Sequence, residues 1–399
     1  MGNNVSRMGN KRTQLLAALA AVAVVVVGVV ALGGLTGSDP TTPTVSSTLP
    51  APTTRTSSTS TSAAPTTTVS EPATGLPLEE PVPLRVYSFG ANGDGMATLD
   101  LEAGTSTVIA PEDSLIRGVD GAVVTPSRSL IVWAGGVVYV MGGDNGFPDR
   151  EILPTNAGPH LRDMRVVPAP DGETVWLIQP GPDSPTLIEL VGLADGARLI
   201  TAESDPGLVP IGATSDGVIF NTDTGQVVLF TYSGVIRPIG EGRALAASAD
   251  TVVWLDCAQP ACGDLLVAHP AEPTQFRVIS KPGEGEWFPV GGSVIPNSTM
   301  PFETISPDGS RLLVGTGQDF DVNGVPATAQ LLSIDLASGA NRPLAAFNRY
   351  QPRATWSSDS EWVVSFEGDL LNLHDYFRPG SVTPLQDVIP EGFRPLAAG

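Results

Sequence analysis

Residues 305–347 decide the fold, and they read ISPDGSRLLVGTGQDFDVNGVPATAQLLSIDLASGANRPLAAF. The stretch divides into strand, SPDG turn, strand, loop, strand, ASG turn and strand, because short apolar runs rich in Val, Ile and Leu are bounded by turn residues. The first turn has a physical basis, since the Asp308 carboxylate can accept backbone N–H groups two residues on and Gly309 takes a positive φ without a Cβ clash. The stretch therefore predicts one unit of four antiparallel strands.

Weaker copies of this unit recur along the chain. Each keeps an Asp before a β-rich run, and they are VVPAPDGETVWLI at 166–178, GATSDGVIF at 212–220, AASADTVVWL at 246–255 and ATWSSDSEWVVSF at 354–366. Two degenerate units precede them, so units start near residues 84, 116, 163, 208, 245, 305 and 354. Seven blades of about 45 residues fit the length of 84–399. The sequence predicts an all-β fold, a β-propeller of seven four-stranded blades, with six or eight blades as alternatives.

The first unit is short and lacks an inner strand. The apolar segment FRPLAA at 393–398 lies at the other end of the propeller region. We expect this segment to complete the first blade and so close the ring.

At these repeats the chain resembles the TolB-type and WD-like β-propellers, whose units carry an S-P-D-G turn between the first two strands. The resemblance is strong at 306–309 and moderate at 169–172, and elsewhere only the Asp persists. It implies a ring-shaped scaffold that binds proteins or peptides. It implies no catalytic residues, because the motif is a turn and a fold does not specify a function.

The composition narrows the classes of partner. A formal net charge of −21 and a pI near 4.3 exclude nucleic acid as a partner, because the acidic surface repels phosphate backbones. Three His and two Cys leave few ligands for a zinc or haem site, and no G-x-S-x-G, H-E-x-x-H or S-x-x-K motif is present. An enzyme stays open as an alternative, because propeller glycosidases gather carboxylates from separate blades.

The N-terminal region predicts a membrane anchor at 15–35. This run, LLAALAAVAVVVVGVVALGGL, carries no charge and is long enough to span about 30 Å of hydrocarbon. Basic residues precede it and the next one is Arg55, so the positive-inside rule places 1–14 in the cytoplasm and the remainder outside. The alternative is a cleaved secretory signal, whose apolar region is normally shorter.

The tract at 36–83 is dominated by Thr, Ser and Pro. It has almost no large apolar residue and cannot bury enough surface to fold, so it predicts a disordered stalk. The stalk is either a plain spacer or an O-glycosylated one.

Cys257 and Cys262 frame the sequence AQPA between two predicted strands. In an exported domain the two thiols would face each other across a hairpin loop, so a disulfide is expected, with two free thiols as the alternative.

Asp319, Asp321 and Asn323, followed by Gly324, reproduce the start of a calcium loop. The twelfth position is Gln330 instead of a bidentate Glu, and no helices flank the loop. The alternatives are a polar hairpin turn and a weak calcium site, and no other cofactor is expected.

An unusual loop at 281–303 is predicted to lead into the sixth unit and to carry the binding face. It presents Trp287 and Phe288 beside Glu284 and Glu286, and exposed aromatic residues ringed by polar groups are common interface anchors. The acidic residues favour a basic or neutral partner. The alternative is that both rings fold back and pack on the propeller.

These observations predict a single-pass plasma-membrane protein whose propeller, 84–399, lies outside the cytoplasm. The expected function is a non-enzymatic scaffold that binds a protein, peptide or glycan at the cell envelope. The alternative is an exported hydrolase of the glycosidase type, with carboxylates around the propeller channel.

Overall fold

The computed structural model describes residues 70–72, 78–90, 95–109, 118–141, 148–152, 164–179, 185–257, 263–279, 286–290, 304–320, 326–347, 353–367, 370–378 and 380–399. All of them belong to the second of the two units of the chain, Ala64–Gly399.

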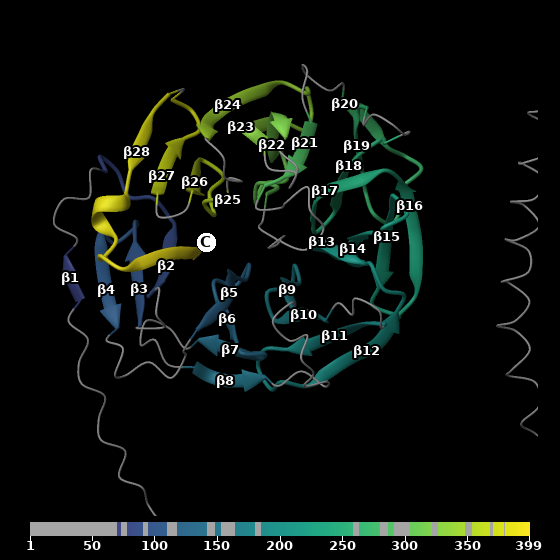
Figure 1. The fold of residues 1–399 in the computed structure, drawn as a ribbon, viewed down its shortest axis with the longest axis horizontal. Coiled ribbons are helices and arrows are strands. Elements are labelled where there is room, and N and C mark those ends of the chain that lie inside the picture. Colours follow the sequence, from purple (N-terminus) through teal and green to yellow (C-terminus); the bar gives the residue numbers. More distant parts are fainter. Residues whose placement is uncertain are drawn as a thin grey trace, which may run out of the picture. The chain divides into compact units, whose positions relative to one another are not determined.

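Seven antiparallel sheets surround a common centre and form the blades of a propeller (Figure 1). From the innermost strand outward, blade 1 has β29 (Phe393–Ala398), β2 (Arg85–Gly90), β3 (Met96–Asp100), β4 (Thr105–Ile109) and a fifth strand, β1 (Ser70–Pro72). Blade 2 has β5 (Val119–Val124), β6 (Leu130–Ala134), β7 (Val137–Met141) and β8 (Pro148–Ile152), and blade 3 has β9 (Arg165–Pro168), β10 (Thr174–Gln179), β11 (Thr186–Gly192) and β12 (Arg198–Ser204).

The remaining blades have four strands each. Blade 4 has β13 (Val209–Thr214), β14 (Gly217–Asn221), β15 (Gln226–Thr231) and β16 (Ile236–Glu241), and blade 5 has β17 (Arg243–Ser248), β18 (Thr251–Leu255), β19 (Leu265–Ala268) and β20 (Arg277–Ile279). Blade 6 has β21 (Glu286–Pro289), β22 (Arg311–Phe320), β23 (Pro326–Asp335) and β24 (Asn341–Phe347), and blade 7 has β25 (Arg353–Trp356), β26 (Trp362–Glu367), β27 (Leu370–Asp375) and β28 (Val382–Pro384). The predicted all-β, seven-bladed propeller of four-stranded blades is confirmed.

The core consists of apolar layers between neighbouring blades. Because successive side chains of a strand point to opposite faces, each central strand supplies two layers. On β10, Trp176 and Ile178 pack towards blade 4, whereas Val175 and Leu177 pack towards blade 2. Both faces are therefore apolar, which explains the continuous runs of Val, Ile, Leu and Trp in the second strand of each blade.

The ring closes through the strand that the sequence predicts. Strand β29 pairs with β2 as the innermost strand of blade 1. Beyond the ladder, Arg85 and Gly399 exchange backbone hydrogen bonds of 3.0 and 3.1 Å. The two ends of the propeller region are thus held in one sheet.

Blade 6 begins earlier than the sequence suggests. Its innermost position is filled first by β21, which pairs with the far half of β22, from Glu286↔Gly317 to Pro289↔Val314. The near half of β22 is bridged by a later segment, through Ile305↔Leu312 and a hydrogen bond from the Leu313 N–H to the Thr304 carbonyl. The predicted start at 305 is wrong, because the inner position of this blade is shared by two segments.

The predicted stalk overlaps the folded domain. Strand β1 lies inside the tract 36–83 and pairs with β4. Val82 is buried in a cluster with Leu84 and Leu373. The predicted span at 15–35 lies outside the described residues, and no helix among the residues that the structure describes is long and apolar enough to cross a membrane.

Candidate functional site

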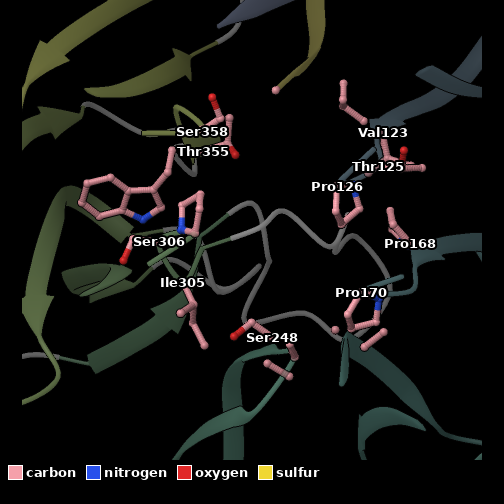
Figure 2. Close-up of a pocket in the computed structure, with 18 of the residues that line it drawn as sticks. Val123, Thr125, Pro126, Pro168, Pro170, Ser248, Ile305, Ser306, Thr355 and Ser358 are labelled. Carbon is pink, nitrogen blue, oxygen red and sulfur yellow. The ribbon is translucent and has the colours of Figure 1, made fainter. Parts of the chain in front are cut away.

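A cavity of 520 Å³ lies at the centre of the ring, and every blade contributes to its wall (Figure 2). The contributing segments are the ends of the inner strands and the turns that follow them. Representative lining residues, one from each of blades 2, 3, 5, 6 and 7, are Thr125, Pro170, Ser248, Ser306 and Ser358. Blade 4 adds Gly212 and Ala213, and blade 1 adds 397–399. The cavity therefore opens at the end of the ring where first and second strands are joined.

The turn at 306–309 shows how the local sequence builds this end. Asp308 accepts hydrogen bonds from the hydroxyls of Ser306 and Ser310 and from the Ser310 N–H. Gly309 has a φ of +71°, and its N–H donates to the Ser306 carbonyl at 2.7 Å. Asp171 caps the equivalent turn of blade 3 in the same way, through the N–H groups of Glu173 and Thr174. The turn predicted between the first two strands is confirmed.

Two residues other than glycine occupy the position of Gly309 in their own turns. They are Arg128 in blade 2, with a φ of +64°, and Ser360 in blade 7, with a φ of +63°. A side chain in the left-handed region costs about 1–2 kcal/mol of conformational energy. Strained residues of this kind cluster at functional sites, and Arg128 lines the cavity.

Hydrogen bonds link the turns of different blades into a collar around the cavity. The Ser127 hydroxyl donates to the Gly172 carbonyl at 2.7 Å, joining blades 2 and 3. Arg128 Nη2 donates to the Ser358 hydroxyl at 2.8 Å, joining blades 2 and 7 past the end of β29. In the same rim, Arg311 Nη1 donates to the Ser360 carbonyl at 2.7 Å, joining blades 6 and 7. Such links hold the turns in place before any ligand arrives.

The wall of the cavity combines apolar surface with hydroxyl groups. Prolines 126, 168, 170 and 307 and several Val and Ala residues form the apolar part, and Thr125, Ser248, Thr355 and Ser358 add hydroxyls. Pockets with this balance of apolar wall and few polar groups are typical ligand sites.

Two carboxylates, Asp250 and Asp308, are among the described lining residues. Partial burial pushes the pKa of Asp308 upward, but the hydrogen bonds from Ser306 and Ser310 outweigh it and lower the pKa overall. A glycosidase acid requires a raised pKa, and Asp308 has a lowered one.

The structure places Trp287 away from the surface. Its side chain is 2% exposed and packs in the cluster between blades 5 and 6 with Leu255 and Leu312. The expectation of an exposed anchor does not hold for this ring, because β21 is a strand of blade 6 and its neighbours enclose the indole. The side chains of Phe288 and Glu286, and all of Glu284, lie outside the described residues.

The other predicted sites fall largely on residues that are not described. Cys262, Asp321 and Asn323 lie outside the described residues, as does the side chain of Asp319 at the end of β22. Cys257 packs against the blade 5 and 6 cluster, and the described part of the chain contains no free cysteine. The disulfide and the weak calcium site therefore stay predictions, and no group of metal-ligating side chains occurs among the described residues.

Sequence reasoning missed that the repeated turn is itself the wall of the site. The pattern was visible, since Pro follows the inner strand at 126, 170 and 307 and Asp follows at 171, 216, 250, 308 and 359. In a propeller every such turn lies at the same end of the ring, so the repeat could have located the cavity.

No protein-family model matches the chain, and no curated protein matches it. Among solved structures it is similar to a TolB-like protein from Agrobacterium tumefaciens, with 14% identity over 72% of this chain and 99% of that one and a TM-score of 0.45. It is also similar to TolB from Acinetobacter baumannii, with 11% identity over 79% of this chain and 83% of that one and a TM-score of 0.40. A third similar structure is the β-propeller domain of the trilobed protease from Pyrococcus furiosus, with 11% identity over 76% of this chain and 95% of that one and a TM-score of 0.49. At these identities the similarity is one of fold alone.

Proposed function

We propose that this chain is a protein-binding scaffold that captures a peptide segment of its partner in the central cavity. The supporting observation is that all seven blades converge on one cavity whose turns are linked by hydrogen bonds. A volume of 520 Å³ admits a short segment and excludes a folded domain. Preformed sites bind with a small ordering cost, which suits a scaffold.

The wall fits a peptide in extended conformation. An apolar side chain can enter between the prolines, while the hydroxyls of Thr125, Thr355 and Ser358 lie within the same wall to bond its backbone. Arg128 is the described lining residue that carries a positive charge, and it would pair with an acidic group of the segment.

The location forms part of the proposal. The apolar run at 15–35 and the Ser/Thr/Pro tract after it support a scaffold anchored in the plasma membrane, with the propeller outside the cytoplasm at the cell envelope.

Site-specific photo-cross-linking in the full-length chain tests this function. A photoreactive amino acid replaces Ser358, which is exposed and lines the cavity, and in a matched control it replaces Ser338, an exposed turn residue outside the cavity. We expect a protease-sensitive adduct from position 358 alone in membranes of the native host. Equal adducts from both positions, or a product that carries glycan without peptide, would contradict the proposal.

A further inference from the structure

Four arginines occupy one equivalent position on the innermost strands of four blades. In each case the arginine pairs with the fifth residue of the second strand of its blade. The pairs are Arg394↔Phe89 in blade 1, Arg165↔Ile178 in blade 3, Arg243↔Leu255 in blade 5 and Arg353↔Phe366 in blade 7. This shared register means that the four residues stand at one level of the ring.

The level lies at the end of the ring opposite the cavity. Each arginine is at or next to the first residue of its inner strand, whereas the cavity is lined by the last residues and the turns that follow. In blade 7, Arg353 and Trp356 are the two ends of β25, and the three steps along the strand between them correspond to about 10 Å. None of the four arginines is among the residues that line the cavity.

The four side chains also share a face. Paired residues of an antiparallel ladder point to the same side of the sheet. The partners of the arginines all belong to the apolar layer that faces the next blade, as Ile178 does between blades 3 and 4 and Phe366 does between blades 7 and 1. The strands that carry the arginines are the innermost of their blades, and Figure 1 shows β9, β17 and β25 around the centre of the ring.

In two of the other blades the same register position on the inner strand carries an apolar residue. These residues are Val209 opposite Asn221 in blade 4 and Phe288 opposite Gly315 in blade 6, whereas in blade 2 the fifth residue, Ala134, faces blade 1 and has no equivalent role. From blade 3 to blade 7 arginine therefore alternates with an apolar residue, and the arginines of the neighbouring blades 7 and 1 follow one another, in a chain whose net charge is −21.

Arg353 shows the physical cost of this arrangement. Burial lowers the pKa of its guanidinium, and within the described part of the chain its side chain has no hydrogen-bond or ion-pair partner. The other three arginines do have interactions of their own, so the inference rests on the shared position of all four. A desolvated guanidinium gains most from an oxyanion, which its planar fork binds in a bidentate manner.

We infer that Arg165, Arg243, Arg353 and Arg394 form a second binding site, an arginine mouth that takes a multivalent oxyanion such as an oligophosphate on the axis of the propeller. The site is separate from the cavity and does not depend on the function proposed for it. Because the arginines surround one axis, a ligand with several charged groups can engage more than one of them. The mouth should therefore prefer tripolyphosphate to orthophosphate.

Calorimetric titration of the purified full chain in detergent tests the arginine mouth, with inorganic tripolyphosphate, orthophosphate and citrate as probes. We expect tripolyphosphate to bind at least about 10-fold more tightly than orthophosphate. The substitution Arg353→Gln should weaken the binding of tripolyphosphate at least about 10-fold. The matched control is Arg277→Gln on the outermost strand β20, which should leave the affinity unchanged. Citrate separates recognition of phosphate from recognition of charge alone, and tighter binding of citrate would overturn the phosphate preference.

Two further measurements keep the inference falsifiable. If Arg353→Gln fails to fold, Arg353→Lys retains the charge but loses the fork, and it should still weaken tripolyphosphate several-fold. A purely structural arginine would instead leave binding intact in both variants. Absence of binding at 10 mM tripolyphosphate, or an equal loss in Arg277→Gln, would overturn the inference.

Discussion

Replacing Trp287 by Ala distinguishes a packed ring from an exposed recognition residue. The indole is 2% exposed and lies among Leu255, Leu265 and Leu312, which come from blades 5 and 6. A buried Trp removes about 150–250 Å² from water, which at about 25 cal/mol/Å² corresponds to about 4–6 kcal/mol as an upper bound. Measured Trp→Ala changes in cores cost about 3–5 kcal/mol.

No hydrogen bond is lost in this substitution, because the Trp287 indole N–H has no partner among the described residues. The expected destabilisation is therefore about 4 kcal/mol and apolar in origin. In a domain of this size about 2 °C of Tm accompany each kcal/mol, so the midpoint should fall by about 8 °C.

Differential scanning calorimetry of the full chain measures this shift. The matched control is Leu199→Ala on the outermost strand β12, where the side chain is 58% exposed and the change should stay within about 0.5 kcal/mol. A Trp287→Ala protein with an unchanged midpoint that no longer captures its partner would refute the packing argument and restore the exposed-anchor interpretation.

Three other predictions follow from single residues. His374 is buried against the Ser365 hydroxyl at 2.7 Å, and burial lowers its pKa from 6.5 to about 4. As the pH falls, the unfolded chain is protonated at this histidine before the folded chain is, so about 3 kcal/mol of stability should be lost between pH 6.5 and 4. Urea titrations should show this loss in the wild type and its absence in His374→Gln. Arg128→Gly and Arg128→Ala both lose the hydrogen bond to Ser358, but only alanine keeps the strained φ, so in calorimetry the glycine variant should be about 1 kcal/mol more stable than the alanine variant. Alkylation without reductant should add no mass to Cys257 or Cys262, and two adducts on the native protein would contradict the predicted disulfide.

The two ends of the ring differ in chemistry although the same strands reach both. The cavity end is made of capped turns, prolines and hydroxyls, and the opposite end carries the four arginines. An inner strand that runs along the axis places its first and last residues at opposite ends of the ring. One scaffold can therefore hold two unlike ligands without conflict between their sites.

Much of the candidate site was within reach of the sequence. The repeated turn with Asp308 as its best example predicts that first and second strands meet at one end of every blade, and the cavity is at that end. The contribution of Arg128 was not predictable, because its positive φ follows from the collar that it joins through Ser358. The equivalence of the four arginines could be recognised only from the strand-pairing register, because the number of residues between the arginine and the capping Asp differs between blades.

The sequence by itself determined the all-β class, favoured seven blades and identified the closing strand, because turns and strand alternation depend on residues that are neighbours in the chain. Only the tertiary structure decided the position of Trp287. Two segments share the inner edge of β22, and on the far half, which β21 occupies, the Trp287 indole packs in the cluster between blades 5 and 6. That outcome depends on packing between residues far apart in sequence, which no local pattern contains.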